Sequence, residues 1–160
     1  MKQHHVFSFL QRMGKSFMLP IAVLPVAGIF LGVGSSLTNE TTIASLHLGS
    51  VLGNGTFLYS VLILLKQVGK ILFDNLPLIF AVSIALGMSK RRKEVAALAA
   101  IIAFFVMHAT INALLCLDGS IVNDVVSGQA LDGSITSVCG MLSLEMGVFG
   151  GIVVGLGVSY

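Results

Sequence analysis

Apolar residues in this chain gather in long runs that are separated by polar stretches. A run of about 20 apolar residues with almost no charge is typical of a helix that crosses a membrane. We therefore expect transmembrane helices over residues 16–36, 73–89 and 95–117, and the start of a further one over 146–160.

The N-terminal segment, residues 1–15, has a different pattern. Val6, Leu10 and Met13 recur at helical spacing, and charged residues such as Arg12 occupy other positions. This pattern predicts an amphipathic helix that lies on the membrane surface. A frayed terminus is the alternative.

The first long apolar run contains Pro20 and Pro25. A cleaved signal peptide is the alternative to a transmembrane helix, but its apolar core is shorter, about 7–15 residues, and prolines fit poorly within it. Prolines are tolerated in a membrane helix because neighbouring helices satisfy the freed carbonyl groups. We therefore expect a transmembrane helix, which both prolines can kink.

Polar residues interrupt the second apolar stretch. Lys66, Lys70 and Asp74 fall on one side of a helix, and Lys70 and Asp74 are four residues apart, the spacing of an ion pair. The pattern predicts an interfacial helix over residues 57–72, followed by the span over 73–89.

The composition supports a membrane environment. Of the 160 residues, 56% are hydrophobic and only 10% are charged, whereas a soluble domain has about 25% charged residues. The predicted fold class is therefore an all-α integral membrane protein, with an N-terminal amphipathic helix and about four transmembrane helices.

The positive charges are unevenly distributed. Residues 37–56 and 118–145 are expected to be loops, and neither contains Lys or Arg, whereas 90–94 is a basic turn. The positive-inside rule then places the N-terminus and this turn in the cytoplasm and the two loops outside. Seven of the nine Lys and Arg residues agree with this topology: Lys2, Arg12, Lys15, Lys90, Arg91, Arg92 and Lys93.

Two polar residues within the span over 95–117 are candidates for a polar site. His108 and Asn112 are four residues apart and share a helix face. An ionisable residue inside a span indicates a functional site by default. The interpretation that we favour is a neutral His108 that is hydrogen-bonded to a neighbouring helix.

The sequence contains no recognisable catalytic, metal or cofactor site. Cys116 and Cys139 do not form a disulfide framework. The MGKS sequence at 13–16 resembles the end of a phosphate-binding loop, but Phe9 stands where that loop needs a glycine. The net charge of +2 gives no reason to expect nucleic acid as a partner.

The last apolar run contains glycines at four-residue steps, at Gly147, Gly151 and Gly155. Such steps let helices approach closely, so we expect tight packing of helices or of subunits here. The run of about 15 residues would measure roughly 22 Å as a helix, less than the hydrocarbon thickness of about 30 Å. We therefore expect the chain to be the N-terminal piece of a longer protein; a tilted or re-entrant helix is the alternative.

Three stretches together resemble a known family. They are LQRMGKSFMLPIAVLPVAGIFLGVGSS, FDNLPLIFAVSIALGMSK and MGVFGGIVVGLGV. They are similar to the enzyme IIC membrane component of the bacterial sugar phosphotransferase system, in the glucose superfamily and nearest its glucose and maltose (α-glucoside) branch.

The resemblance implies a multi-pass protein of the bacterial inner membrane, in contact with lipid, that carries a sugar inward as the sugar is phosphorylated. It implies IIB and IIA partner components and a homodimer. The complete system is a transferase that takes its phosphoryl group from protein phosphohistidine. The sugar-binding residues are expected in a C-terminal half beyond this chain, so no catalytic residue, metal or cofactor is assigned here.

Asp74, Asn75 and Pro77 match the family's stretch before the second span. We expect Asp74 and Asn75 to cap a helix that restarts there, with Pro77 in its first turn. The alternative function for the whole chain is a self-contained four-helix scaffold or channel-forming oligomer, in which His108 and Asn112 line a pore.

Overall fold

The computed structural model describes residues 2–45, 47, 52–53, 55–122, 125–126 and 133–159. The chain divides into two compact units, one formed by residues 1–20 and 75–160 and the other by residues 21–74. Parts of the expected loops over 37–56 and 118–145, and Tyr160 at the end of the last apolar run, lie outside the described residues.

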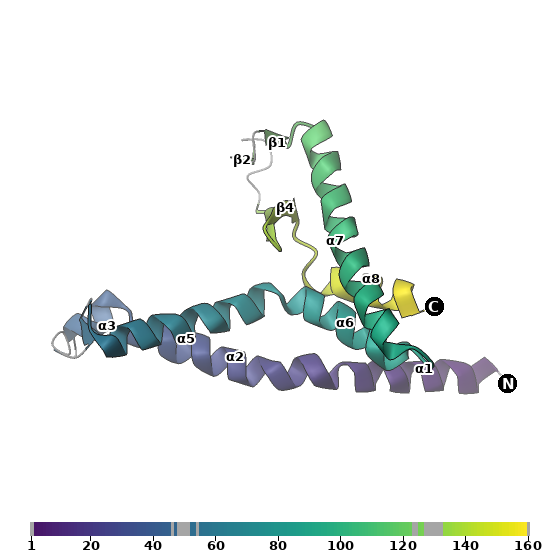
Figure 1. The fold of residues 1–160 in the computed structure, drawn as a ribbon, viewed down its shortest axis with the longest axis horizontal. Coiled ribbons are helices and arrows are strands. Elements are labelled where there is room, and N and C mark those ends of the chain that lie inside the picture. Colours follow the sequence, from purple (N-terminus) through teal and green to yellow (C-terminus); the bar gives the residue numbers. More distant parts are fainter. Residues whose placement is uncertain are drawn as a thin grey trace. The chain divides into compact units, whose positions relative to one another are not determined.

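The unit of residues 21–74 consists mainly of two helices that lie side by side (Figure 1). They are α2 (Met18–Leu37), which continues through Pro25, and α5 (Phe57–Asp74). Glycine allows a close approach at two points: a Cβ at Gly34 would lie 2.7 Å from the backbone nitrogen of Lys66, and a Cβ at Gly69 would lie 2.8 Å from the carbonyl oxygen of Ala27. The expected loop over 37–56 also contains a short helix, α3 (Glu40–Ser45).

The other unit contains four helices among the residues described. They are α1 (Lys2–Ser16), α6 (Leu76–Met88), α7 (Lys93–Leu117) and α8 (Gly147–Ser159). Pro20, which belongs to this unit, is among its fully buried side chains. The turn between α1 and α2 is at Phe17, close to the boundary expected between residues 15 and 16.

Helices α6 and α7 run antiparallel, because the short segment 89–92 joins them and their buried residues meet in reverse order. Ala85 clusters with Ala96 and Ala100 near that turn, and Ala81 clusters with Phe104 further along. These small side chains are buried, so the two helices approach closely over the half next to the turn.

The expected loop over 118–145 contains strands. In the first hairpin, β1 (Ile121–Val122) pairs antiparallel with β2 (Val125–Val126). In the second, β3 (Ile135–Val138) pairs antiparallel with β4 (Met141–Leu144), so that Val138 lies opposite Met141. The interpretation of the whole segment as loop was therefore wrong for these residues. The two-residue turn explains the second hairpin: Cys139 and Gly140 have φ values of 50° and 86°, and positive φ at both central residues suits the twist of a tight hairpin.

The helices have the length and composition of a membrane protein. Among the described residues, two helical segments are long and apolar enough to cross a membrane, Val6–Leu37 and Lys93–Leu117. The pair α5 and α6 passes the same test when taken together as one interrupted span. Helix α8 is apolar but shorter. The predicted fold class, an all-α membrane protein, is confirmed. The exact topology of the spans stays a prediction.

Candidate functional site

The β3–β4 hairpin is hydrogen-bonded to α7 at His108. The Nδ1 atom of His108 lies 2.8 Å from the hydroxyl oxygen of Ser143 on β4. Both residues are buried, with exposed fractions of 2% for His108 and 0% for Ser143. The ring of His108 also packs edge-on against Phe104, with centroids 4.5 Å apart. Each of these two buried polar side chains therefore satisfies the other.

A second hydrogen bond joins the hairpin to α7 one helical turn further on. The Nδ2 atom of Asn112 donates to the carbonyl oxygen of Leu142 at 2.6 Å. His108 and Asn112 thus lie on the same face of α7, as their spacing predicts, and both are hydrogen-bonded to β4. Their partner is a β-hairpin, where the sequence predicted a helix. The two side chains attach this hairpin, and His108 is too buried to line an open pore.

The hairpin turn makes a third polar contact, to the start of α6. The thiol Sγ of Cys139 donates to the side-chain oxygen of Asn75 at 3.4 Å. Burial raises the pKa of the Cys139 thiol, which keeps the thiol protonated and able to donate. The hairpin is therefore hydrogen-bonded to α7 and to the N-cap residue of α6. Figure 1 shows it beside α7.

The expected capping of α6 is correct in position and wrong in mechanism. Asn75 occupies the N-cap position and Pro77 lies in the first turn, but the Asn75 side chain makes no cap hydrogen bond; its oxygen accepts from Cys139 instead. Asp74 is the last residue of α5, and the described residues include no ion pair between Asp74 and Lys70. Both of these side chains are exposed.

The depth of His108 explains why its hydrogen bond matters. Fifteen residues separate His108 from Lys93, the first residue of α7, which is about 22 Å along the helix axis. In a helix that crosses a hydrocarbon layer of about 30 Å, this position lies within the layer. Non-helical backbone is tolerated at such depth only where protein or a water-filled cavity covers it. Within the described part of the chain, no buried side-chain nitrogen or oxygen lacks a partner.

The glycine steps of α8 pack this helix against α6. A Cβ at Gly151 would collide with the carbonyl oxygen of Pro77, and a Cβ at Gly155 would lie 2.7 Å from that of Ala81. Gly147 begins the helix with φ of 50° and has open space around it. Two of the three glycines therefore serve a helix–helix contact within the chain, while homodimer packing stays a prediction.

Sequence reasoning missed the partners of the polar residues. Ser143, Leu142 and Cys139 belong to a segment interpreted as loop, although the alternation in ITSVCGMLSL and its central Cys-Gly pair are signals of a hairpin. Reasoning from sequence also missed the close contacts at Gly34 and Gly69.

The described residues assemble no candidate metal site. Among them, no group of three or more His, Cys, Asp and Glu side chains is arranged to hold a metal ion. His108 and Cys139 are each committed to a hydrogen bond with a neighbouring polar group. The arrangement is suited to holding a hairpin against helices.

Comparison with known proteins connects the chain to one family. Residues 14–160 match the family described as "Phosphotransferase system, EIIC". The "PTS system glucose-specific EIICBA component" of Staphylococcus saprophyticus is 41% identical over 150 residues. The match covers 94% of this chain and 20% of that relative, so the chain spans about a fifth of the relative's length.

Proposed function

Because this chain belongs to the phosphotransferase system EIIC family, we propose that it is the N-terminal part of a membrane transporter that couples inward movement of a sugar to its phosphorylation. The family match over residues 14–160 carries this proposal. The apolar helices of the chain support it, because they give the protein a membrane location.

Glucose is the proposed sugar. The relative that is 41% identical over 150 residues is named as glucose-specific. Maltose and other α-glucosides are the second choice, from the resemblance to the glucose and maltose branch. The described residues include no assembled sugar site, so the binding residues are proposed to lie in a part of the transporter outside this chain.

The proposed partners are IIB and IIA components and a second copy of the transporter. The relative's name, an EIICBA component, supports the first two, and the general family resemblance supports the homodimer. In this proposal, the N-terminus and the turn over 90–94 face the cytoplasm, as their positive charges favour.

Sugar uptake tests this function. The full-length protein is expressed in bacteria that lack their own glucose uptake systems, and radiolabelled methyl α-glucoside is supplied. We expect the sugar to accumulate as its phosphate, and an excess of unlabelled glucose to reduce the accumulation more than maltose does. Accumulation of the free sugar, or no uptake by a protein that reaches the membrane, would contradict the proposal. Stronger competition by maltose would mean that the substrate is maltose and not glucose, and the proposed coupling of transport to phosphorylation would be unaffected.

The channel-forming alternative predicts a different result in the same cells. It predicts ion leakage that needs no phosphoryl donor. The burial of His108 and its bond to Ser143 do not favour it, because a pore-lining side chain would be open to water.

A further inference from the structure

Two basic segments that are far apart in the sequence meet at one end of the unit formed by residues 1–20 and 75–160. Helix α1 packs against α6. At the C-terminal ends of both helices, a Cβ at Gly87 would collide with the side chain of Ser16. Nearer the start of α6, the ring of Phe80 and that of Phe17, which follows α1, have centroids 5.7 Å apart.

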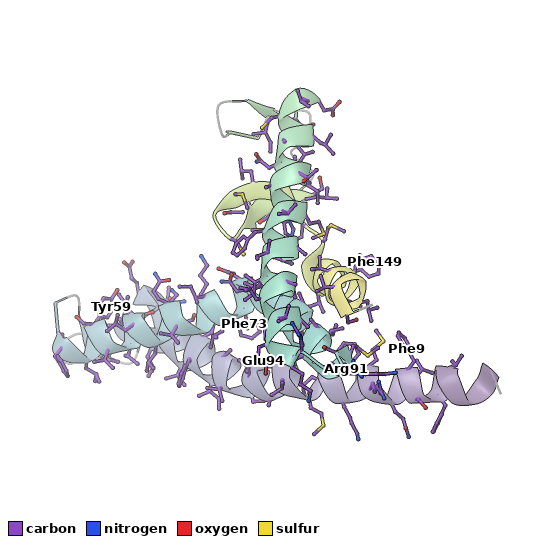
Figure 2. The ribbon with its side chains drawn as sticks, turned by 45° about the vertical axis from the view of Figure 1, so that its right-hand side comes forward. Phe9, Tyr59, Phe73, Arg91, Glu94 and Phe149 are labelled. Atoms are coloured by element: carbon purple, nitrogen blue, oxygen red, sulfur yellow. The ribbon has the colours of Figure 1, made fainter. Side chains whose placement is uncertain are left out.

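This packing places the positive charges of both segments near one another. Lys15 directly precedes Ser16, and the turn begins three residues after Gly87. Figure 2 shows Arg91 on that turn beside α1, and Glu94 where α7 begins. We call the six cations the basic surface, and all six are exposed: Arg12, Lys15, Lys90, Arg91, Arg92 and Lys93.

Acidic residues offset little of this charge. Of the described acidic residues in this unit, only Glu94 lies beside the basic surface. Asp118 lies beyond the far end of α7, a helix of 25 residues and therefore about 37 Å long. Glu145 precedes α8, whose Gly151 packs on Pro77 at the end of α6 away from the turn.

The basic surface also coincides with the end of an apolar helix. Lys93 is the first residue of α7 and of the candidate span Lys93–Leu117, so the cations lie where that span leaves the hydrocarbon. The N-cap residue Arg92 makes no side-chain cap hydrogen bond, and the positive end of the helix dipole adds to the attraction for an anion.

We propose that the basic surface binds the headgroups of anionic phospholipids, with Arg12 and Lys15 from α1 and the four cations of the turn around the same phosphates. Clusters of four to eight Lys and Arg next to a membrane helix bind anionic lipid in this way. A membrane is favoured over an acidic protein because α1 also exposes apolar side chains, with Phe7 62% and Leu10 58% exposed. This inference requires no sugar, so its failure would leave the proposed function unaffected.

Paired charge-neutralising variants of the full-length protein test this inference. R12Q/K15Q removes two charges from α1, and R91Q/R92Q removes two from the turn. K66Q/K70Q is the matched control, since it removes two exposed charges from α5 in the other unit. R91K/R92K keeps the charge of the turn and tests whether charge alone restores binding.

The measurement is binding of a fluorescent phosphatidylglycerol to the purified protein in a mild uncharged detergent at low salt. Each cation near an anionic surface contributes about 1 kcal/mol, or roughly a fivefold change in affinity. We expect R12Q/K15Q and R91Q/R92Q each to weaken binding by about 25-fold, and K66Q/K70Q and R91K/R92K to leave it nearly unchanged. Unlabelled phosphatidylglycerol should displace the probe, whereas phosphatidylcholine and inorganic phosphate should not.

Four results would overturn the inference. Three concern the controls: an equal loss in the K66Q/K70Q control, equal displacement by phosphatidylcholine, and equal displacement by inorganic phosphate. The fourth is unchanged binding in both neutralised variants. If lipid binding were unchanged in both neutralised variants while phosphoryl transfer from the IIB component was lost, the basic surface would be a protein-docking surface, and the lipid proposal would be wrong.

Discussion

The two halves of α7 are held by different kinds of interaction: apolar packing in the first half and hydrogen bonds in the second. Near the turn, Ala96 and Ala100 pack closely against Ala85 of α6. Further along, His108 and Asn112 hold the β3–β4 hairpin through hydrogen bonds of 2.8 Å and 2.6 Å. A regular helix surface is complementary to a neighbouring helix, whereas a hairpin brings polar backbone that must be satisfied.

The same contrast extends to α6. One face of α6 receives the glycines of α8 with almost no space between the backbones, and its first turn meets the hairpin through Asn75 and Cys139. Close apolar packing is sensitive to added volume, while the polar junctions are sensitive to a lost partner. Substitutions that act on one kind of contact alone separate the two.

The largest effect is expected from adding volume between α8 and α6. Gly151→Ala places a methyl group against the Pro77 carbonyl, and overpacking of this kind costs about 1–3 kcal/mol. We expect a clearly lower midpoint of thermal unfolding in detergent. Gly157→Ala on the same helix is the control, because nothing lies within 4 Å of a Cβ there. Equal midpoints for the two variants would show that the close contact does not exist.

A loss of similar size is expected from removing the His108 ring nitrogen. His108→Leu leaves the buried Ser143 hydroxyl without its partner, at a cost of about 1–3 kcal/mol. Thr110→Val is the matched control, because Thr110 is exposed and its hydroxyl donates to the carbonyl of Val106 on its own helix. Thermal unfolding of both variants in the same detergent checks the difference, and a larger loss for Thr110→Val would contradict it.

Asn112→Leu should have a milder effect. It removes the bond to the Leu142 carbonyl and the longer one, 3.9 Å, that Asn112 accepts from the Cys116 thiol. Asn112 is only partly buried, so water can replace part of the lost interaction. A loss of about 1 kcal/mol is expected, together with faster proteolysis of the hairpin. Protection of the hairpin equal to that of the wild type would show that this bond does not hold it.

The smallest expected effect is a difference in the reactivity of the two cysteine thiols. Cys116 is exposed and Cys139 is partly buried, and burial raises the pKa of Cys139. Because the thiolate is the reactive form, maleimide labelling of Cys139 in a Cys116→Ala variant should be slow near neutral pH and should accelerate into the alkaline range. Asn75→Ala should speed this labelling by freeing the thiol. Labelling of Cys139 as fast as that of Cys116 at neutral pH would contradict its placement.

The apolar helices could be predicted from the sequence because the hydrophobic pattern reports directly on burial in lipid. The break between α5 and α6 was expected near Asp74 and occurs at Asn75, since Pro77 and its polar neighbours mark a helix start in any environment. His108 and Asn112 could be placed on one face from their spacing alone.

The hydrogen-bond partners of these residues could not be predicted from the sequence, because the pairs form only through tertiary contacts. His108 meets Ser143, which lies 35 positions away in the sequence, and Asn75 meets Cys139, 64 positions away. Residues 118–145 were interpreted as loop because of their polar composition, and the hairpin within them was therefore not predicted. The function of the glycines in α8 was also undetermined, because a GxxxG step is equally suited to a neighbouring helix and to a second subunit.

The most direct measurement of how the hairpin is held is a double-mutant cycle between His108 and Ser143. The free energy of unfolding is measured for the wild type, His108→Leu, Ser143→Ala and the double variant in one detergent. If the two side chains bond as the structure has them, the double variant should be less destabilised than the sum of the single variants, by about 0.6–1.7 kcal/mol. Additive losses, with no coupling between the two positions, would contradict the polar attachment of the β3–β4 hairpin to α7.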